Sequence, residues 1–230
     1  MCMKDMYKVT LLAFILALCV YSPVIAEEKA KDKINEPGQE YPALQISPIF
    51  SQLVLLSLPK GFKVVFENMG QDGKTYIREA VLEGETVDQW SQMITVTGVK
   101  GEVAVPNVAP KVFAERFATR FKGACPDTFF AKALAATKIS EQDAFIILIG
   151  CGSVQRNGGA KQSETALVIV IKGSADYYTI QWAERGDASS QPIAPNEAEW
   201  IERFKKLNPI KICPRTPGEA APYPSCINQK

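Results

Sequence analysis

Ser57 and Lys60 are the pair in this sequence whose spacing most resembles a nucleophile motif. They match S-x-x-K, in which a lysine one helical turn away activates a serine. Pro59 lies inside the motif and the neighbouring residues are strand-like, so the two side chains would not meet as they do on a helix. Neither S-D-N nor K-T-G follows. The pattern favours a coincidence at a strand end, and a Ser/Lys-based hydrolase is the less favoured alternative.

Four carboxylates cluster around one predicted turn: Glu79, Glu83, Glu85 and Asp88. Paired carboxylates can hydrolyse glycosides or hold calcium, but no calcium-loop pattern accompanies these, and surface turns are commonly acidic. The 230 residues contain no histidine, which excludes Ser-His and Cys-His nucleophiles and His-ligated zinc or copper. We therefore predict no catalytic residue, no metal and no cofactor, and expect that the protein is not an enzyme. Carboxylate-based hydrolysis is a minor alternative.

The glycine-rich stretch Gly152–Lys161 (GSVQRNGGAK) resembles a phosphate-binding loop only superficially. It lacks the G-x-x-x-x-G-K-[ST] spacing, and the residues that follow, 165–171, are strand-like rather than the start of a helix. A glycine-rich hairpin loop is the favoured interpretation.

Arg116, Arg120 and Lys122 form a basic stripe toward the end of a predicted helix. Cations at a helix C-terminus stabilise the helix dipole, which is sufficient to explain them. The alternative, more specific interpretation is that these three residues form a surface that binds an anion or a lipid headgroup.

The N-terminus reads as a secretion signal. Lys4 and Lys8 precede a twelve-residue apolar run, Val9–Val20, which is too short to cross a bilayer of roughly 30 Å as a helix. Small residues ending at Ala26 then precede a charged stretch, which is typical of a signal-peptidase site. We expect residues 1–26 to be removed and the product to be periplasmic or secreted. A retained membrane anchor and a lipoprotein at Cys19 are less favoured.

Four cysteines remain after Ala26: Cys125, Cys151, Cys213 and Cys226. An even number in an exported chain indicates two disulfides. A predicted turn at residues 140–143 would bring Cys125 close to Cys151, and the other two cysteines bracket one proline-rich segment. The favoured pairs are therefore Cys125–Cys151 and Cys213–Cys226. A four-cysteine metal site lacks any C-x-x-C pair.

The tail, residues 211–230, is rich in proline and closed by the second predicted disulfide. Prolines at 214, 217, 222 and 224 restrict φ and remove N–H donors, so we expect the segment after Cys213 not to join a sheet or a helix. The favoured interpretation is a clasp that fastens the chain end. The alternative is a preordered loop that presents Tyr223 to a partner.

Alternating and helical periods predict the remaining elements. Residues 27–45 are expected to be a flexible charged leader, and residues 46–210 a single α+β domain. Phe113, Phe117 and Phe121 recur every four residues and predict an amphipathic helix over 110–122; a second helix, capped by Asn196, follows. Strands are predicted over 53–58, 62–66, 75–82, 90–97, 129–139, 144–151, 165–171 and 177–183.

This order predicts an α+β fold, a mainly antiparallel sheet flanked by two amphipathic helices and stapled by two disulfides. It resembles the PsbP-like α/β/α sandwich over residues 50–208. The residues that carry the resemblance are Pro59–Phe62 opening a strand, the strand over 90–97, and the terminal helix around Trp200. The family's members mostly bind partners or assist assemblies without catalysis, so the resemblance implies a binding role and no catalytic residue.

The charge balance narrows the classes of partner. Lys and Arg number 26 and Asp and Glu number 25, a net charge of +1, whereas nucleic-acid binding needs a basic excess. We predict an exported, non-enzymatic binding or accessory module for a protein or envelope component, without stable membrane insertion. The alternative is a carrier of a small apolar ligand, held between the sheet and a helix among aromatic residues otherwise assigned to the core. Those residues are Trp90, Phe113, Phe117, Trp182, Trp200 and Phe204.

Overall fold

The computed structural model describes residues 42–155 and 159–229. The predicted signal peptide and residues 27–41 of the predicted leader lie outside this part. No helix in the described ranges is long and apolar enough to cross a membrane.

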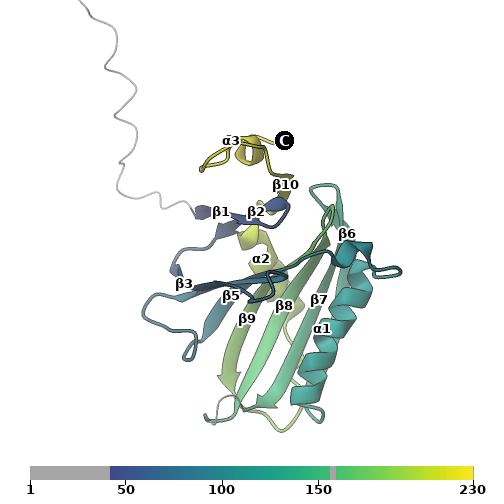
Figure 1. Cartoon of the computed structure of the whole chain (residues 1–230). Helices are drawn as coiled ribbons and strands as arrows, with labels where there is room; N and C mark the ends of the chain where they lie inside the picture. The colour runs from purple at the N-terminus through teal and green to yellow at the C-terminus, as the bar shows by residue number, and fades with distance from the viewer. Residues whose placement is uncertain (1–41, 156–158, 230) are drawn as a thin grey trace, which may run out of the picture. The chain divides into compact units, whose positions relative to one another are not determined.

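Seven antiparallel strands form a large sheet in the order β3-β4-β5-β9-β8-β7-β6 (Figure 1). The bounds are Phe62–Met69 (β3), Thr75–Leu82 (β4), Gln92–Val99 (β5), Phe129–Ile139 (β6), Gln142–Val154 (β7), Gln162–Lys172 (β8) and Tyr177–Asp187 (β9). Strands that are consecutive in sequence pair within each of the two predicted meanders. The pairing of β5 with β9 joins the two meanders into one sheet.

A second, smaller sheet has the order β1-β2-β10, with bounds Ala43–Ile49, Gln52–Leu58 and Lys211–Pro214. β1 begins inside the segment predicted as a leader, because the backbone from Ala43 onward pairs with the end of β2. The sequence predicts no strand there, because Leu44 is the only large apolar side chain among the first three residues of β1.

The expectation that the tail would join neither sheet nor helix is wrong at two places. Pro214 is the last residue of β10 and lies opposite Gln52 of β2. β10 is an edge strand, where a proline does not interrupt a ladder on both sides. The short helix α3, Pro224–Ile227, begins at a proline, which suits the first helical position because no N–H is needed there.

The two helices of the domain cover opposite faces of the large sheet. α1, Pro110–Ala124, packs against β6, β7 and β8, and its Ala114 and Phe121 share one core cluster with Val168. α2, Glu197–Leu207, shares the other cluster with Ile169 and the small sheet. Adjacent residues of a strand point to opposite faces, so the side chain of Val168 enters one core and that of Ile169 enters the other. A short 3-10 helix, Glu102–Ala104, precedes α1. The predicted α+β fold is confirmed.

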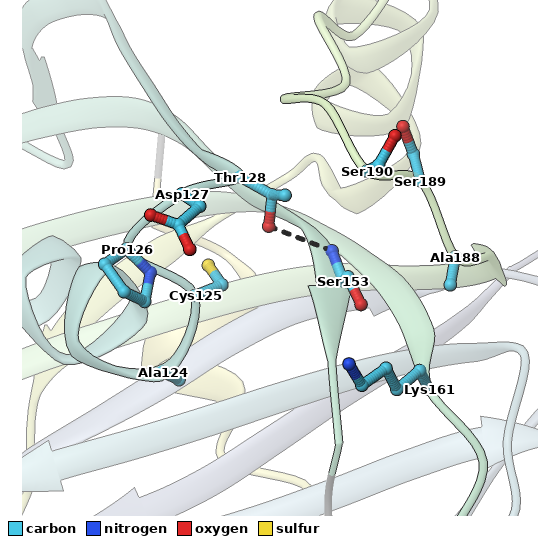
Figure 2. A pocket seen from close by; sticks show the side chains of 10 residues that line it. All are labelled: Ala124, Cys125, Pro126, Asp127, Thr128, Ser153, Lys161, Ala188, Ser189 and Ser190. Carbon is cyan, nitrogen blue, oxygen red and sulfur yellow. Dashed lines mark hydrogen bonds between the residues drawn. The ribbon is translucent and has the colours of Figure 1, made fainter.

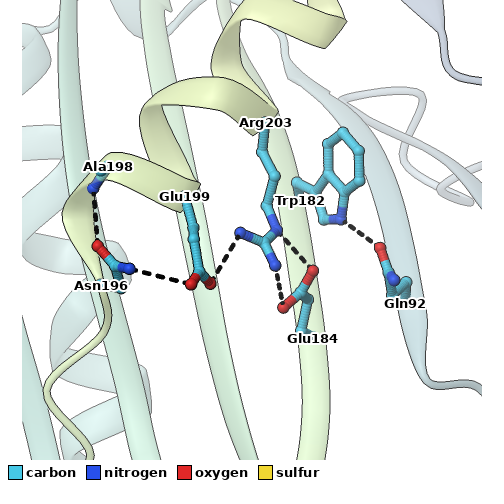
Figure 3. A network of polar contacts seen from close by, with 7 residues as sticks. All are labelled: Gln92, Trp182, Glu184, Asn196, Ala198, Glu199 and Arg203. Atoms are coloured by element: carbon cyan, nitrogen blue, oxygen red, sulfur yellow. Dashed lines mark hydrogen bonds and ion pairs between the residues drawn. The ribbon is translucent and has the colours of Figure 1, made fainter.

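One polar network fastens α2 to β9 (Figure 3). Arg203 Nε and Nη2 donate to the two carboxylate oxygens of Glu184 at 2.5 and 2.7 Å, and its guanidinium lies 4.5 Å from the centre of the Trp200 ring. Asn196 caps α2 as predicted, since its Oδ1 accepts from the Ala198 N–H at 3.2 Å. The Arg203–Glu184 ion pair is partly shielded from water, which strengthens it.

Both edge strands of the large sheet are irregular. In β3 the register with β4 shifts between Val64 and Phe66, and in β6 the register with β7 shifts between Ala133 and Ala135. Each shift leaves one extra residue in the edge strand, the mark of a β-bulge.

Two disulfides join described residues, Cys125–Cys151 and Cys213–Cys226, with Cα atoms 5.7 and 5.6 Å apart. The first joins the end of α1 to β7, and the second joins β10 to α3. These are the pairs that the spacing of the cysteines favoured.

Candidate functional site

The tail and the β1–β2 turn enclose a hollow of about 350 Å³, which we call the tail hollow. Its lining residues are Ser51, Leu53, Arg215, Thr216, Pro217, Gly218, Glu219 and Tyr223. Tyr223, the residue that the sequence singled out for partner binding, therefore lies in a concavity. Arg215 and Glu219 were not predicted, although their position inside a disulfide-closed loop could have suggested them.

The loop around this hollow is held at several points. Glu219 accepts hydrogen bonds from the N–H and Oγ of Ser225, at 2.8 and 2.6 Å. Arg215 Nη1 donates to the Phe50 carbonyl at 3.2 Å, which ties the loop to the β1–β2 turn. Together with the Cys213–Cys226 disulfide, these contacts order a segment that has little core of its own.

Tyr223 has a left-handed backbone, with φ 59° and ψ 62°. A bulky residue rarely adopts this conformation, which costs energy unless the surroundings fix it. Here the Tyr223 N–H donates to the Ala220 carbonyl at 3.1 Å, and the Tyr223 carbonyl accepts from the Cys226 N–H at 3.0 Å. The half-buried side chain packs against a cluster that contains Leu53 and the disulfide. Its position is therefore well defined.

The two charged side chains of the tail hollow, Glu219 and Arg215, differ in how many partners they have. Both Glu219 oxygens are engaged by Ser225, whereas the Arg215 guanidinium forms no ion pair with another described residue. A guanidinium carries five N–H donors, so Arg215 retains most of its capacity to bind a carboxylate.

The predicted basic stripe is a pair rather than a row of three. Arg116, Arg120 and Lys122 are all exposed on α1. Arg116 and Arg120 are one turn apart and share a side, while Lys122 lies about 200° around the helix from Arg120 at 3.6 residues per turn. Any anion held by the two arginines would not be shared with Lys122.

The other residues that suggested chemistry lie apart from one another. Ser57 is only 2% exposed within β2, and Lys60 is exposed in the turn after it. Glu79 lies on β4, while Glu85 in the following turn accepts from the N–H and Oγ of Ser91 at 3.0 and 2.6 Å. Burial raises the pKa of Glu79. No group of acidic or cysteine residues in the described ranges has metal-binding spacing.

A second hollow, of about 450 Å³, lies beside the end of α1, and we call it the α1-end hollow (Figure 2). It is lined by Ala124, Cys125, Pro126, Asp127, Thr128, Ser153, Lys161, Ala188, Ser189 and Ser190. The segment between β7 and β8 is a hairpin connection, as the sequence favoured; its residues 156–158 lie outside the described part. Four separated segments build this hollow, so no local pattern could predict it.

The aromatic residues proposed for an apolar ligand pocket pack instead against neighbours. Phe113 stacks on Tyr177 with ring centres 4.7 Å apart, and Arg185 lies 3.6 Å from the centre of the Trp90 ring. Trp182 and Trp200 are 4% exposed within one core cluster. Both hollows described above are lined in large part by polar side chains.

No protein-family model and no curated protein matches this chain. Among solved structures, the Ran-binding protein Mog1p of Saccharomyces cerevisiae is 14% identical with a TM-score of 0.39, over 72% of this chain and 85% of that one. The cyanobacterial PsbP of a Synechocystis species is 13% identical with a TM-score of 0.37, over 74% and 91%. A protein of Bacteroides thetaiotaomicron is 13% identical with a TM-score of 0.36, over 72% and 46%.

The PsbP protein is thus among the solved structures similar to this chain, in agreement with the resemblance noted from the order of elements.

Proposed function

We propose that this protein is an exported, non-enzymatic binding module of the cell envelope that holds a protein partner at the tail hollow. The observation that carries the proposal is Tyr223, fixed in a left-handed backbone on a disulfide-closed loop over a concavity. A residue held in an unfavourable conformation by its surroundings is typical of a binding site. A preordered loop also loses less entropy when it binds.

The chemistry of the tail hollow favours a partner segment that carries a carboxylate. Arg215 offers unpaired donors and Tyr223 offers an aromatic face, while each Glu219 carboxylate oxygen already accepts a hydrogen bond from Ser225. Tyrosine and arginine are also the residue types that dominate binding energy at protein interfaces.

Export is supported by the N-terminal pattern and by two disulfides, which persist in oxidising compartments. N-terminal sequencing of the protein from its native cells tests this part, with Glu27 as the expected first residue. A product that begins at Met1 and stays in the membrane fraction would contradict it.

Binding is tested by affinity capture from the native envelope with four forms of the protein. The wild type is compared with Tyr223→Ala and Arg215→Gln, and with Ile201→Ala as a control, because Ile201 is exposed on α2 and does not line the tail hollow. We expect one protein to be enriched by the wild type and the control and lost by both tail variants. If no captured protein depends on Tyr223 or Arg215, the tail hollow is not the binding site.

A further inference from the structure

The α1-end hollow presents one negative and one positive side chain that are both available to a ligand. Neither the Asp127 carboxylate nor the Lys161 ammonium group forms a hydrogen bond or ion pair with another described residue. In Figure 2 Asp127 and Lys161 lie on different sides of the hollow. We propose that this hollow binds a small zwitterion, a compound that carries an ammonium group and a carboxylate, as amino acids and short peptides do.

The walls of the hollow are fixed before any ligand binds. The Cys125–Cys151 disulfide joins the end of α1 to β7, and Thr128 Oγ1 accepts from the Ser153 N–H at 3.1 Å (Figure 2). The Thr128 carbonyl accepts from the Gly152 N–H at 2.9 Å. Because these contacts link separated segments, the positions of Asp127 and Ser153 are set by the fold.

The third wall, residues 188–190, lies directly on Gly152. The Ser189 N–H donates to the Gly152 carbonyl at 2.7 Å, and a Cβ built on Gly152 would lie 2.2 Å from the Gln191 carbonyl oxygen. Only glycine permits this approach, so Gly152 sets the distance between the 188–190 segment and β7.

The end of the hollow next to α1 suits the ammonium group. α1 ends at Ala124, and the C-terminal end of a helix carries a partial negative charge. Asp127 adds a full negative charge on the same side. Together they oppose a lone anion such as phosphate at this end.

The opposite side suits the carboxylate. Lys161 supplies a positive charge, and the hydroxyls of Ser153 and Ser190 have no hydrogen-bond partner among the described residues. A lysine and two hydroxyls can together donate several hydrogen bonds to a carboxylate. The volume of about 450 Å³ falls in the range of roughly 300–1,000 Å³ typical of small-molecule sites.

The proposal is tested by titrating the isotope-labelled protein and following its NMR spectrum. The probes are glycine, glycylglycine and triglycine as zwitterions, glycinamide with the ammonium group alone, N-acetylglycine with the carboxylate alone, and inorganic phosphate. We expect at least one zwitterion to bind about tenfold more tightly than either singly charged compound, since each charged contact adds to affinity. The length series measures which separation of charges fits.

Two variants assign the contacts. Asp127→Asn should lower the affinity for the zwitterion to that for N-acetylglycine, and Lys161→Gln should lower it to that for glycinamide. Asp88→Asn and Lys206→Gln are matched controls, because both residues are exposed and neither lines the hollow. The proposal is overturned if no zwitterion binds, if phosphate binds more tightly than all three, or if the two variants behave as the controls do.

Discussion

Ser51 and Asp176 lie 125 residues apart in the sequence and are joined by a hydrogen bond of 2.6 Å from Ser51 Oγ to Asp176 Oδ2. Asp176 is 2% exposed and also accepts from the N–H groups of Ser51 and Gly101, at 3.3 and 2.9 Å, and from the Tyr178 hydroxyl at 3.4 Å. One carboxylate thus fastens the turn of the small sheet to two turns of the large sheet.

Replacing Asp176 should weaken the protein and change its response to acid. Burial alone would raise the pKa of Asp176, but the hydrogen bonds from Ser51, Gly101 and Tyr178 together hold it below its ordinary value. An acid with a lowered folded-state pKa stabilises the fold above its unfolded pKa of about 3.9, and this stabilisation is lost as the pH falls through the folded value. We expect Asp176→Asn to lower the free energy of unfolding at pH 7 by about 1.5–3 kcal/mol.

The measurement is urea denaturation of wild type, Asp176→Asn and the exposed control Asp88→Asn between pH 2 and pH 7. The difference between Asp176→Asn and the wild type should shrink as the pH falls below about 4. A constant difference over the whole range would show that the Asp176 charge does not contribute.

Glu79 should have the opposite dependence on pH. Burial raises its pKa in the folded state, so ionisation of Glu79 lowers stability as the pH rises above its unfolded pKa of about 4.3. Glu79→Gln is therefore expected to melt at a higher temperature than the wild type at pH 7 and at the same temperature near pH 3. Calorimetry at the two pH values checks this, and a lower melting temperature at pH 7 would show that Glu79 has a favourable partner.

A pair of glycine substitutions tests the close approach at Gly152. Gly152→Ala should destabilise the protein by about 1–3 kcal/mol, because the added Cβ would meet the Gln191 carbonyl oxygen. Gly123→Ala, near the end of α1 with open space around its Cβ, should be neutral or stabilising by up to about 1 kcal/mol. If the two variants change the free energy of unfolding equally in chemical denaturation, the 188–191 segment moves away from the added Cβ without loss of stability.

Removing the tail disulfide separates the two interpretations of the tail. The clasp predicts that Cys213→Ser with Cys226→Ser lowers the free energy of unfolding by about 3 kcal/mol, since the disulfide closes a loop of sequence separation 13. Thermal melting and partner capture are measured together. An unchanged melting temperature with lost capture would favour the presenting loop instead.

The contact between α2 and the sheet depends on the geometry of Arg203. Arg203→Ala should cost about 1.5–3 kcal/mol, because it leaves the Glu184 carboxylate without its two-point partner and uncovers Trp200. Arg203→Lys should restore only part of this loss, since an ammonium group cannot make the paired contact. Lys206→Ala, an exposed neighbour on α2, is the control in the same denaturation experiment. A lysine variant as stable as the wild type would contradict the paired geometry.

The sequence predicted those elements whose pattern is local. The fourfold spacing of Phe113, Phe117 and Phe121 predicts a helix where α1 lies, and β4 and β6 have the bounds predicted for strands there. The prolines of the tail predict an irregular segment, whereas the residues around Ile212 form the strand β10. Pairing with β2, about 160 residues earlier, makes that strand, and no local pattern encodes such a pairing.

The candidate sites show the same limit. Tyr223 stood out as an isolated apolar group between prolines, and the structure places it in a hollow. Ser51 and Leu53 complete that hollow from the other end of the chain. Asp127 and Lys161 were each ordinary surface charges in the sequence, because only the packing of separated segments brings them to one cavity.

The bulges in β3 and β6 have a consequence for a protein at high local concentration. A regular edge strand offers a row of unpaired N–H and C=O groups on which another molecule can continue the sheet. In each edge strand of the large sheet a bulge interrupts the regular spacing of these groups, between Val64 and Phe66 in β3 and between Ala133 and Ala135 in β6. Copies crowded together therefore find no uninterrupted template along either margin of the large sheet, which hinders growth of that sheet by the addition of strands.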